Sequence, residues 1–122
     1  MQDTYISFYL KANRIHIFVD ALRGLGSPSR ICFMVEESGE TLLVAPYEKR
    51  DFKSHSVPPE VYNGTGGMEV SSFKLCWIIA DMHHWDISRS YRIPGKVYSE
   101  QKVAIFRLPE AEVIDRAEGE LP

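Results

Sequence analysis

Apolar residues in this chain gather in short segments that are separated by glycine, proline and polar turns. No apolar run approaches the roughly 18–20 residues that a membrane-spanning helix needs. Within the segments, alternation with period two indicates strands, and spacing of three or four residues indicates helices. At 122 residues, with 44% hydrophobic and 25% charged residues, the chain fits one globular domain. We therefore expect a single α+β domain over residues 1–115, built on antiparallel strands.

Most of the segments are typical of strands, because they are rich in aromatic and β-branched residues and alternate in polarity. Two pairs are joined by short polar turns, which predicts two hairpins, and Pro46 indicates a sheet edge or the end of a strand. Strands are predicted at residues 5–11, 31–37, 41–47, 90–98 and 102–108, with shorter ones at 52–57, 68–70 and 111–114.

A first helix is predicted over residues 13–25. Asn13 is a suitable N-cap, and Gly24, Gly26 and Pro28 end the helix. Its apolar residues recur at i, i+3, i+4, i+7 and i+10, and they are Ile15, Phe18, Val19, Leu22 and Leu25. This spacing places them on one face of a helix.

A second helix is predicted after Ser71 or Ser72, either of which could act as its N-cap. The alternative is a buried strand over residues 73–79, since short apolar runs are ambiguous. The serine and the helical spacing favour the helix. Its predicted core-facing residues are Leu75, Ile78, Ile79 and Met82, joined by Cys76.

The predicted order contains a β-α-β-β unit twice, and this order resembles one domain of a DNA sliding clamp. Domains of that family have about this length and carry two helices on one face of antiparallel sheets, so the resemblance implies that the two predicted helices pack on one face of the sheet here. Residues 67–75, a short strand entering a serine-started helix, resemble the pattern best, and residues 103–108 look like a closing strand. The resemblance spans residues 5–115 and lies in the order of elements, without a diagnostic motif.

In sliding clamps the outward faces of the helices are basic and line a channel around DNA. Here Arg14 and Arg23 share the first helix with Asp20, and Lys74 shares the second with Asp81. The net charge is small, whereas binding by counterion release requires many cations. The resemblance also implies several copies, because clamp rings contain six domains. It therefore supports a clamp-like fold and self-association better than it supports a clamp's activity.

One region mixes cations with aromatic residues, a composition that can stack bases and pair with phosphates. Its residues are Arg89, Tyr91, Arg92, Lys96, Tyr98 and Lys102. The same alternation is equally expected on the solvent face of an antiparallel hairpin. The region is the best candidate for binding nucleic acid or a partner.

The segment after residue 80 contains the residues most suited to a metal. Asp81 and His84 are three positions apart on the predicted helix and could share one ion. Such a site would need further ligands, for example His55 or His16. The alternative is a polar helix end, where histidines suit the helix dipole.

No other pattern points to catalysis or to a cofactor. The chain lacks a G-x-S-x-G elbow, and the glycines at residues 64–67 lack the Lys-Ser/Thr of a P-loop. Cys32 and Cys76 lie in apolar segments, which predicts buried, unreactive thiols without a disulfide. We therefore predict neither catalytic residues nor a cofactor, and enzymatic activity is not favoured.

The net charge of −3 comes mainly from the end of the chain. Residues 109–122 contain five acidic residues and one basic residue, so residues 116–122 are predicted to be an acidic, solvated tail. The rest is nearly neutral and shows no strongly basic footprint. The first residues lack the features of a secretory signal, and a cytoplasmic location is expected.

These observations favour a non-enzymatic binding or assembly module with a clamp-like fold. It would associate with itself or with another protein, and no membrane partner is expected. Two alternatives stay open: a DNA-associated accessory protein using the Arg89 to Lys102 region, and a small metal-dependent enzyme centred on Asp81 and His84.

Overall fold

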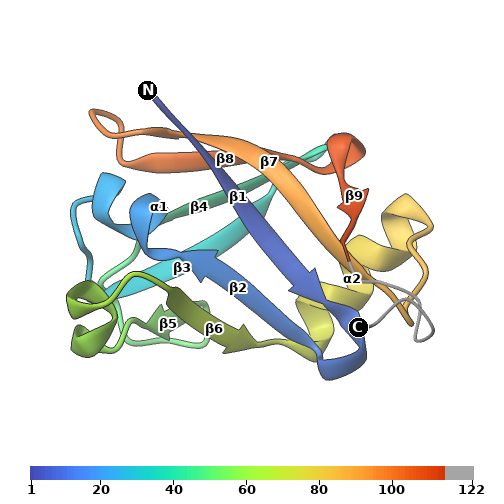
Figure 1. The fold of residues 1–122 in the computed structure, drawn as a ribbon, viewed down its shortest axis with the longest axis horizontal. Coiled ribbons are helices and arrows are strands. Elements are labelled where there is room, and N and C mark those ends of the chain that lie inside the picture. The colour runs from blue at the N-terminus through green and yellow to red at the C-terminus, as the bar shows by residue number, and fades with distance from the viewer. Residues whose placement is uncertain (115–122) are drawn as a thin grey trace.

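The computed structural model describes residues 1–114, and its main element is a curved sheet in which every pairing is antiparallel (Figure 1). A short strand, β9 (Glu112–Val113), pairs with β7 beside this series. The other strands follow the order β5 (Ser54–Ser56), β3 (Arg30–Val35), β4 (Thr41–Pro46), β8 (Val103–Arg107), β7 (Ser90–Tyr98), β1 (Gln2–Tyr9), β2 (Arg14–Phe18) and β6 (Gly67–Ser71).

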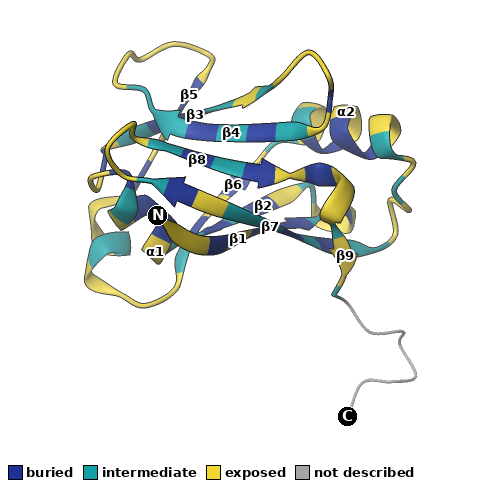
Figure 2. Cartoon of the chain, turned by 90° about the horizontal axis from the view of Figure 1, so that it is seen from above, coloured by how far each residue is buried: buried dark blue, intermediate teal, exposed yellow. Residues whose placement is uncertain are grey.

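Two α-helices accompany the sheet, α1 (Val19–Gly24) and α2 (Phe73–His83). They lie at opposite ends of the long axis of the molecule (Figure 1, Figure 2). Both contribute buried side chains to the same hydrophobic cluster. Short 3-10 turns occur at Leu10–Ala12, Pro59–Asn63 and Leu108–Glu110. The predicted α+β class, with an antiparallel sheet and two helices, is therefore confirmed.

The core is a single cluster that receives side chains from both ends of the sheet. Alternate residues of the longer strands point into it, as period two requires. Inward pairs include Ile6 and Phe8 of β1, Ile15 and Ile17 of β2, Leu42 and Val44 of β4, and Ala104 and Phe106 of β8. Each fully buried Ile, Leu or Phe stabilises the fold by about 1.5–3 kcal/mol relative to an exposed one. The curvature of the sheet thus brings one core together.

The first predicted helix was wrong in its first half. Residues 14–18 form β2, which pairs with β1 on one side and β6 on the other. Ile15 and Ile17 are fully buried in this strand, so their period-two alternation prevailed over the helical spacing. Asn13 does not cap a helix; it adopts a left-handed conformation (φ 53°) in the connection between β1 and β2. Only Val19–Gly24 is helical.

The second predicted helix is confirmed together with its cap. Ser72 is the N-cap of α2, and its Oγ accepts a hydrogen bond from the amide of Leu75 at 3.2 Å. The predicted inward face is wrong at two positions, because Ile78 and Met82 are exposed. The fully buried residues of α2 are Cys76, Ile79 and Ala80. Part of the apolar surface of α2 therefore faces away from the sheet.

The remaining predicted strands are all present, but the first, predicted at residues 5–11, is β1 at Gln2–Tyr9, and Leu10–Ala12 form a 3-10 turn instead. The two expected hairpins are β3–β4 and β7–β8, and the three short strands are β5, β6 and β9. Pro46 ends β4, which lies between β3 and β8 and is not an edge strand. The predicted acidic tail at residues 116–122 lies outside the described residues. In residues 1–114, neither helix is long and apolar enough to cross a membrane.

The element order contains strand–helix–strand–strand twice, as β2-α1-β3-β4 and as β6-α2-β7-β8. Equivalent strands of the two series also pair with each other. β4 is antiparallel to β8, and β2 is antiparallel to β6. β1 stands before the first series and pairs with β7 and β2.

Candidate binding surfaces

The outward side of α2 carries large apolar residues that the core does not use. Phe73 is 61% exposed, Trp77 47%, Ile78 44% and Met82 42%. We call this surface the α2 face; it consists of these four residues with Lys74 and Asp81 between them. A helix that is apolar on all sides is normally buried on all sides. Contiguous exposed apolar residues of this kind mark binding surfaces.

Two hollows flank Trp77 on the α2 face. Ile87, which is also exposed, borders both of them. The first, of about 210 Å³, is lined by Leu10, Lys11, Asn13, Cys76, Trp77 and Ile87. The second, of about 190 Å³, is lined by Trp77, Ala80, Asp81, His84, Trp85 and Ile87. The surface is therefore hollowed on both sides of an exposed indole, which suits inserted side chains from a partner.

The loop that follows α2 is held by an aromatic cluster. Trp85 stacks on Tyr91 with ring centroids 4.6 Å apart and meets Phe8 edge-on at 5.7 Å. The amide of Asp86 donates a hydrogen bond to the hydroxyl of Tyr91 at 2.8 Å. On the other side, Nε2 of His83 lies 2.6 Å from the carbonyl oxygen of Gly39. These contacts hold the C-terminal end of α2 against the sheet.

The two residues predicted for a metal, Asp81 and His84, both line the hollow beside Trp77. The further histidines lie elsewhere: His16 contacts the ring of Phe18 on β2, and His55 contacts Phe33 from β5. Within residues 1–114, no group of three or more His, Cys, Asp or Glu side chains could hold a metal ion. The structure thus brings together two of the four hypothesised ligands.

The region from Arg89 to Lys102 is divided between the two faces of the sheet. Arg92, Lys96 and Tyr98 are alternate residues on the outer face of β7. Tyr91 is buried on the inner face, where Trp85 stacks on it. Arg89 precedes β7, and Lys102 lies in the β7–β8 turn with φ 54°.

The outer-face cations of this region have acidic partners. Nζ of Lys96 lies 2.8 Å from Oδ1 of Asp3, and Nη2 of Arg92 lies 3.0 Å from Oε1 of Glu112. The guanidinium of Arg92 also lies over the ring of Tyr5, 4.8 Å from its centre. The ion pair with Lys96 lowers the pKa of the Asp3 carboxyl and raises the pKa of the lysine. This face therefore presents balanced charge rather than a basic patch.

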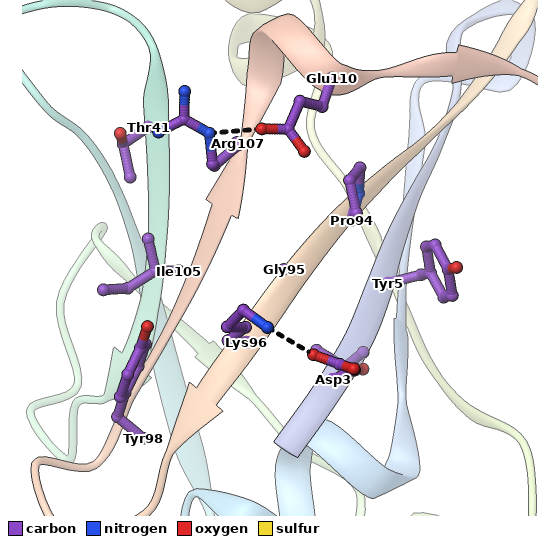
Figure 3. A pocket seen from close by; sticks show the side chains of 11 residues that line it. Asp3, Tyr5, Thr41, Pro94, Gly95, Lys96, Tyr98, Ile105, Arg107 and Glu110 are labelled. Carbon is purple, nitrogen blue, oxygen red and sulfur yellow. Dashed lines mark hydrogen bonds and ion pairs between the residues drawn. The ribbon is translucent and has the colours of Figure 1, made fainter. Parts of the chain in front are cut away.

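A shallow hollow of about 480 Å³ crosses the outer face of β1, β7, β8 and β4 (Figure 3). Its charged side chains are paired with each other. Lys96 pairs with Asp3, and Nε of Arg107 lies 2.6 Å from Oε2 of Glu110. It is lined by Asp3, Thr4, Tyr5, Thr41, Pro94, Gly95, Lys96, Tyr98, Ile105, Arg107 and Glu110. These residues include no cysteine, serine or histidine that could act as a nucleophile or general base.

Both cysteines are free and buried, as predicted. Burial raises the pKa of the Cys76 thiol to about 11 and also raises the pKa of Cys32. A thiol in this state is a poor nucleophile at neutral pH, since the thiolate is the reactive form.

No protein family, no curated protein and no solved structure matches this chain. The α2 face must therefore be interpreted from its own residues. Sequence reasoning did not assign Phe73 and Trp77 to any surface, although their spacing of four places them on one side of a helix. Their rings are 5.6 Å apart in the structure. The predicted second helix has more large apolar residues than one buried face can hold. This excess was the sequence signal that could have revealed the α2 face.

Proposed function

We propose that this chain is a non-enzymatic binding module that docks another protein chain through the α2 face. The observation that carries the proposal is the exposure of Phe73, Trp77, Ile78 and Met82 along one helix. Aromatic residues at the centre of an apolar surface are the usual anchors of protein interfaces. The contacts of Trp85 and His83 hold the helix in place, so little order has to be gained on binding.

The proposal includes a clamp-like, internally duplicated architecture. Its support is the repeated order β2-α1-β3-β4 and β6-α2-β7-β8, together with the pairing of equivalent strands, β4 with β8 and β2 with β6. A fold of this kind does not carry a DNA role by itself. We also retain the cytoplasmic location as part of the proposal, because a reducing compartment suits two buried free thiols.

The DNA alternative finds less support in the geometry. Lys96 and Arg92 form ion pairs with acidic residues, and Tyr91 is buried, so three of the six residues predicted to bind nucleic acid are already engaged within the chain. The metal alternative is limited to Asp81 and His84, which are too few to hold an ion in a closed site. We therefore propose protein binding as the function.

Site-specific photo-crosslinking inside cells that express the chain tests this proposal. A photoreactive phenylalanine replaces Trp77 in one variant and Phe52 in a matched control. Phe52 is 90% exposed in the β4–β5 connection, away from α2. We expect discrete adducts to a defined protein at position 77 and none at position 52, and Ile78→Asp should abolish those at 77. Equal labelling at both positions, or adducts that survive Ile78→Asp, would contradict the proposal.

A further inference from the structure

We propose that the protein docked on the α2 face is a second copy of this chain, whose α2 packs antiparallel to the first about a two-fold axis. This inference rests on the proposed function and adds the identity of the partner. The axis would pass close to Trp77 and Ile78, at the centre of the exposed stretch of the helix.

The order of residues along the α2 face is symmetric about its centre. Phe73 and Met82 lie at its two ends, and Trp77 and Ile78 lie in the middle. An antiparallel pair would bring Trp77 against Trp77 of the second copy, and Ile78 against Ile78 of the second copy. Two-fold pairing requires such a self-complementary surface, because each copy offers the same residues in reverse order.

The charges of the α2 face follow the same symmetry. The centre of the face lies between Trp77 and Ile78, and Lys74 and Asp81 are equally far from it on opposite sides along the helix. They are seven residues apart, so they lie on the same side of the helix, about 10.5 Å apart along its axis. In an antiparallel pair each Lys74 would face Asp81 of the second copy. The surface is therefore complementary in charge to its own reverse.

Within one copy these two charges are placed unfavourably. Lys74 lies in the first turn of α2, which contains no acidic residue, and Asp81 lies in the last turn. The helix dipole favours the opposite arrangement. Neither side chain forms an ion pair or hydrogen bond with another residue of the described part. A second copy would supply each of them with the opposite charge.

The position of α2 leaves room for this packing. The helix lies at one end of the molecule, with exposed residues along it (Figure 2). The hollows of about 210 Å³ and 190 Å³ on either side of Trp77 would receive side chains of the second copy. A contact centred on one helix of 11 residues is small, so we expect weak to moderate affinity, with a dissociation constant of roughly micromolar order.

Reversing the charge of Lys74 or of Asp81 in the purified chain tests the inference. Lys74→Glu places like charges opposite each other in the dimer, and so does Asp81→Lys. Each single variant should raise the dissociation constant of the dimer roughly tenfold, since two attractive pairs become repulsive. An equimolar mixture of the two variants restores opposite charges at both contacts, so it should form the mixed dimer. Sedimentation velocity and native mass spectrometry measure both results.

The two variants should fold, because each replaces an unfavourable charge with the one that the helix dipole prefers. Circular dichroism checks this directly. Lys53→Glu makes the same change of charge on an exposed lysine outside α2 and should leave the dimer unchanged. A dimer that responds equally to Lys53→Glu, or that ignores both α2 substitutions, overturns the inference. So does a mixture that shows no preference for the mixed dimer.

The two proposals fail in different ways. If the purified chain stays monomeric up to roughly millimolar concentration, while position 77 still crosslinks to a different protein in cells, the second copy is excluded and the binding function stands. If position 77 gives no specific adduct to any protein, both proposals fail.

Discussion

At the scale of single residues, Gly95 shows how tightly β7 and β8 pack on the core side of the sheet. It lies on β7 opposite Phe106 of β8. A Cβ atom at this position would stand 2.4 Å from Cδ1 of Phe106 and 2.5 Å from the carbonyl oxygen of Ile105. The ring of Phe106 is fully buried, and the carbonyl belongs to the backbone. Neither neighbour can move away cheaply, so this position requires glycine for space.

We predict that Gly95→Ala destabilises the fold by about 1–3 kcal/mol, the usual cost of forcing an extra carbon into a packed site. Gly66→Ala is the matched control, since a Cβ at Gly66 meets nothing within 4 Å. Urea unfolding of both variants against the parent chain measures the difference. Equal midpoints for the two alanine variants would show that the sheet adjusts freely at β7.

At the scale of elements, α2 depends on its N-cap because its first turn has no acidic residue to satisfy the free amides. Ser72 Oγ accepts from the amide of Leu75. We predict that Ser72→Ala lowers the free energy of unfolding by about 0.5–2 kcal/mol. Ser71→Ala, at an exposed position of β6, is the control and should change it little. Thermal and urea unfolding compare the two; a larger effect of Ser71→Ala would mean that the strand rather than the cap limits stability.

Sequence patterns predicted most strands and the second helix, because short-range signals decide them: alternation for β3, β4, β7 and β8, and a serine cap for α2. The first helix was wrong because Ile15 fits both periods, and only pairing of β2 with β1 and β6 selects the strand. The pairing with β6 joins residues far apart in the chain, such as Ile15 and Val70. A single sequence gives no measure of it.

The candidate site was harder to predict for a related reason. Helical spacing identifies the apolar positions of α2 but not which of them meet the sheet, and Ile78 and Met82 were assigned inward although they are exposed. The opposite directions of Tyr91 and Arg92 did follow from period two, and the sequence could have separated them. The ion pair between Lys96 and Asp3 joins β7 to β1, so it depended on the sheet order.

At the scale of the whole molecule, one hydrophobic cluster joins both helices to strands from both ends of the sheet. Cys32 lies on β3 near one end of the strand order, whereas Cys76 lies on α2 against the core. Cys76 belongs to the cluster, whereas Cys32 is buried outside it, so the two thiols report on different parts of the domain. A domain with one core should open in one cooperative step, and both thiols should become reactive in that step.

We predict that neither thiol reacts with an aromatic disulfide reagent at pH 8 in the native chain, and that both react at the same urea midpoint. Cys76 is doubly protected. It is buried, and its pKa of about 11 leaves about one thiolate per thousand molecules at that pH. Cys32→Ala and Cys76→Ala variants isolate each thiol, and the fully unfolded chain supplies the reference rate. Reaction of Cys32 well before Cys76 would mean that β3 and β5 open separately, and that the sheet contains two cooperative units around its core.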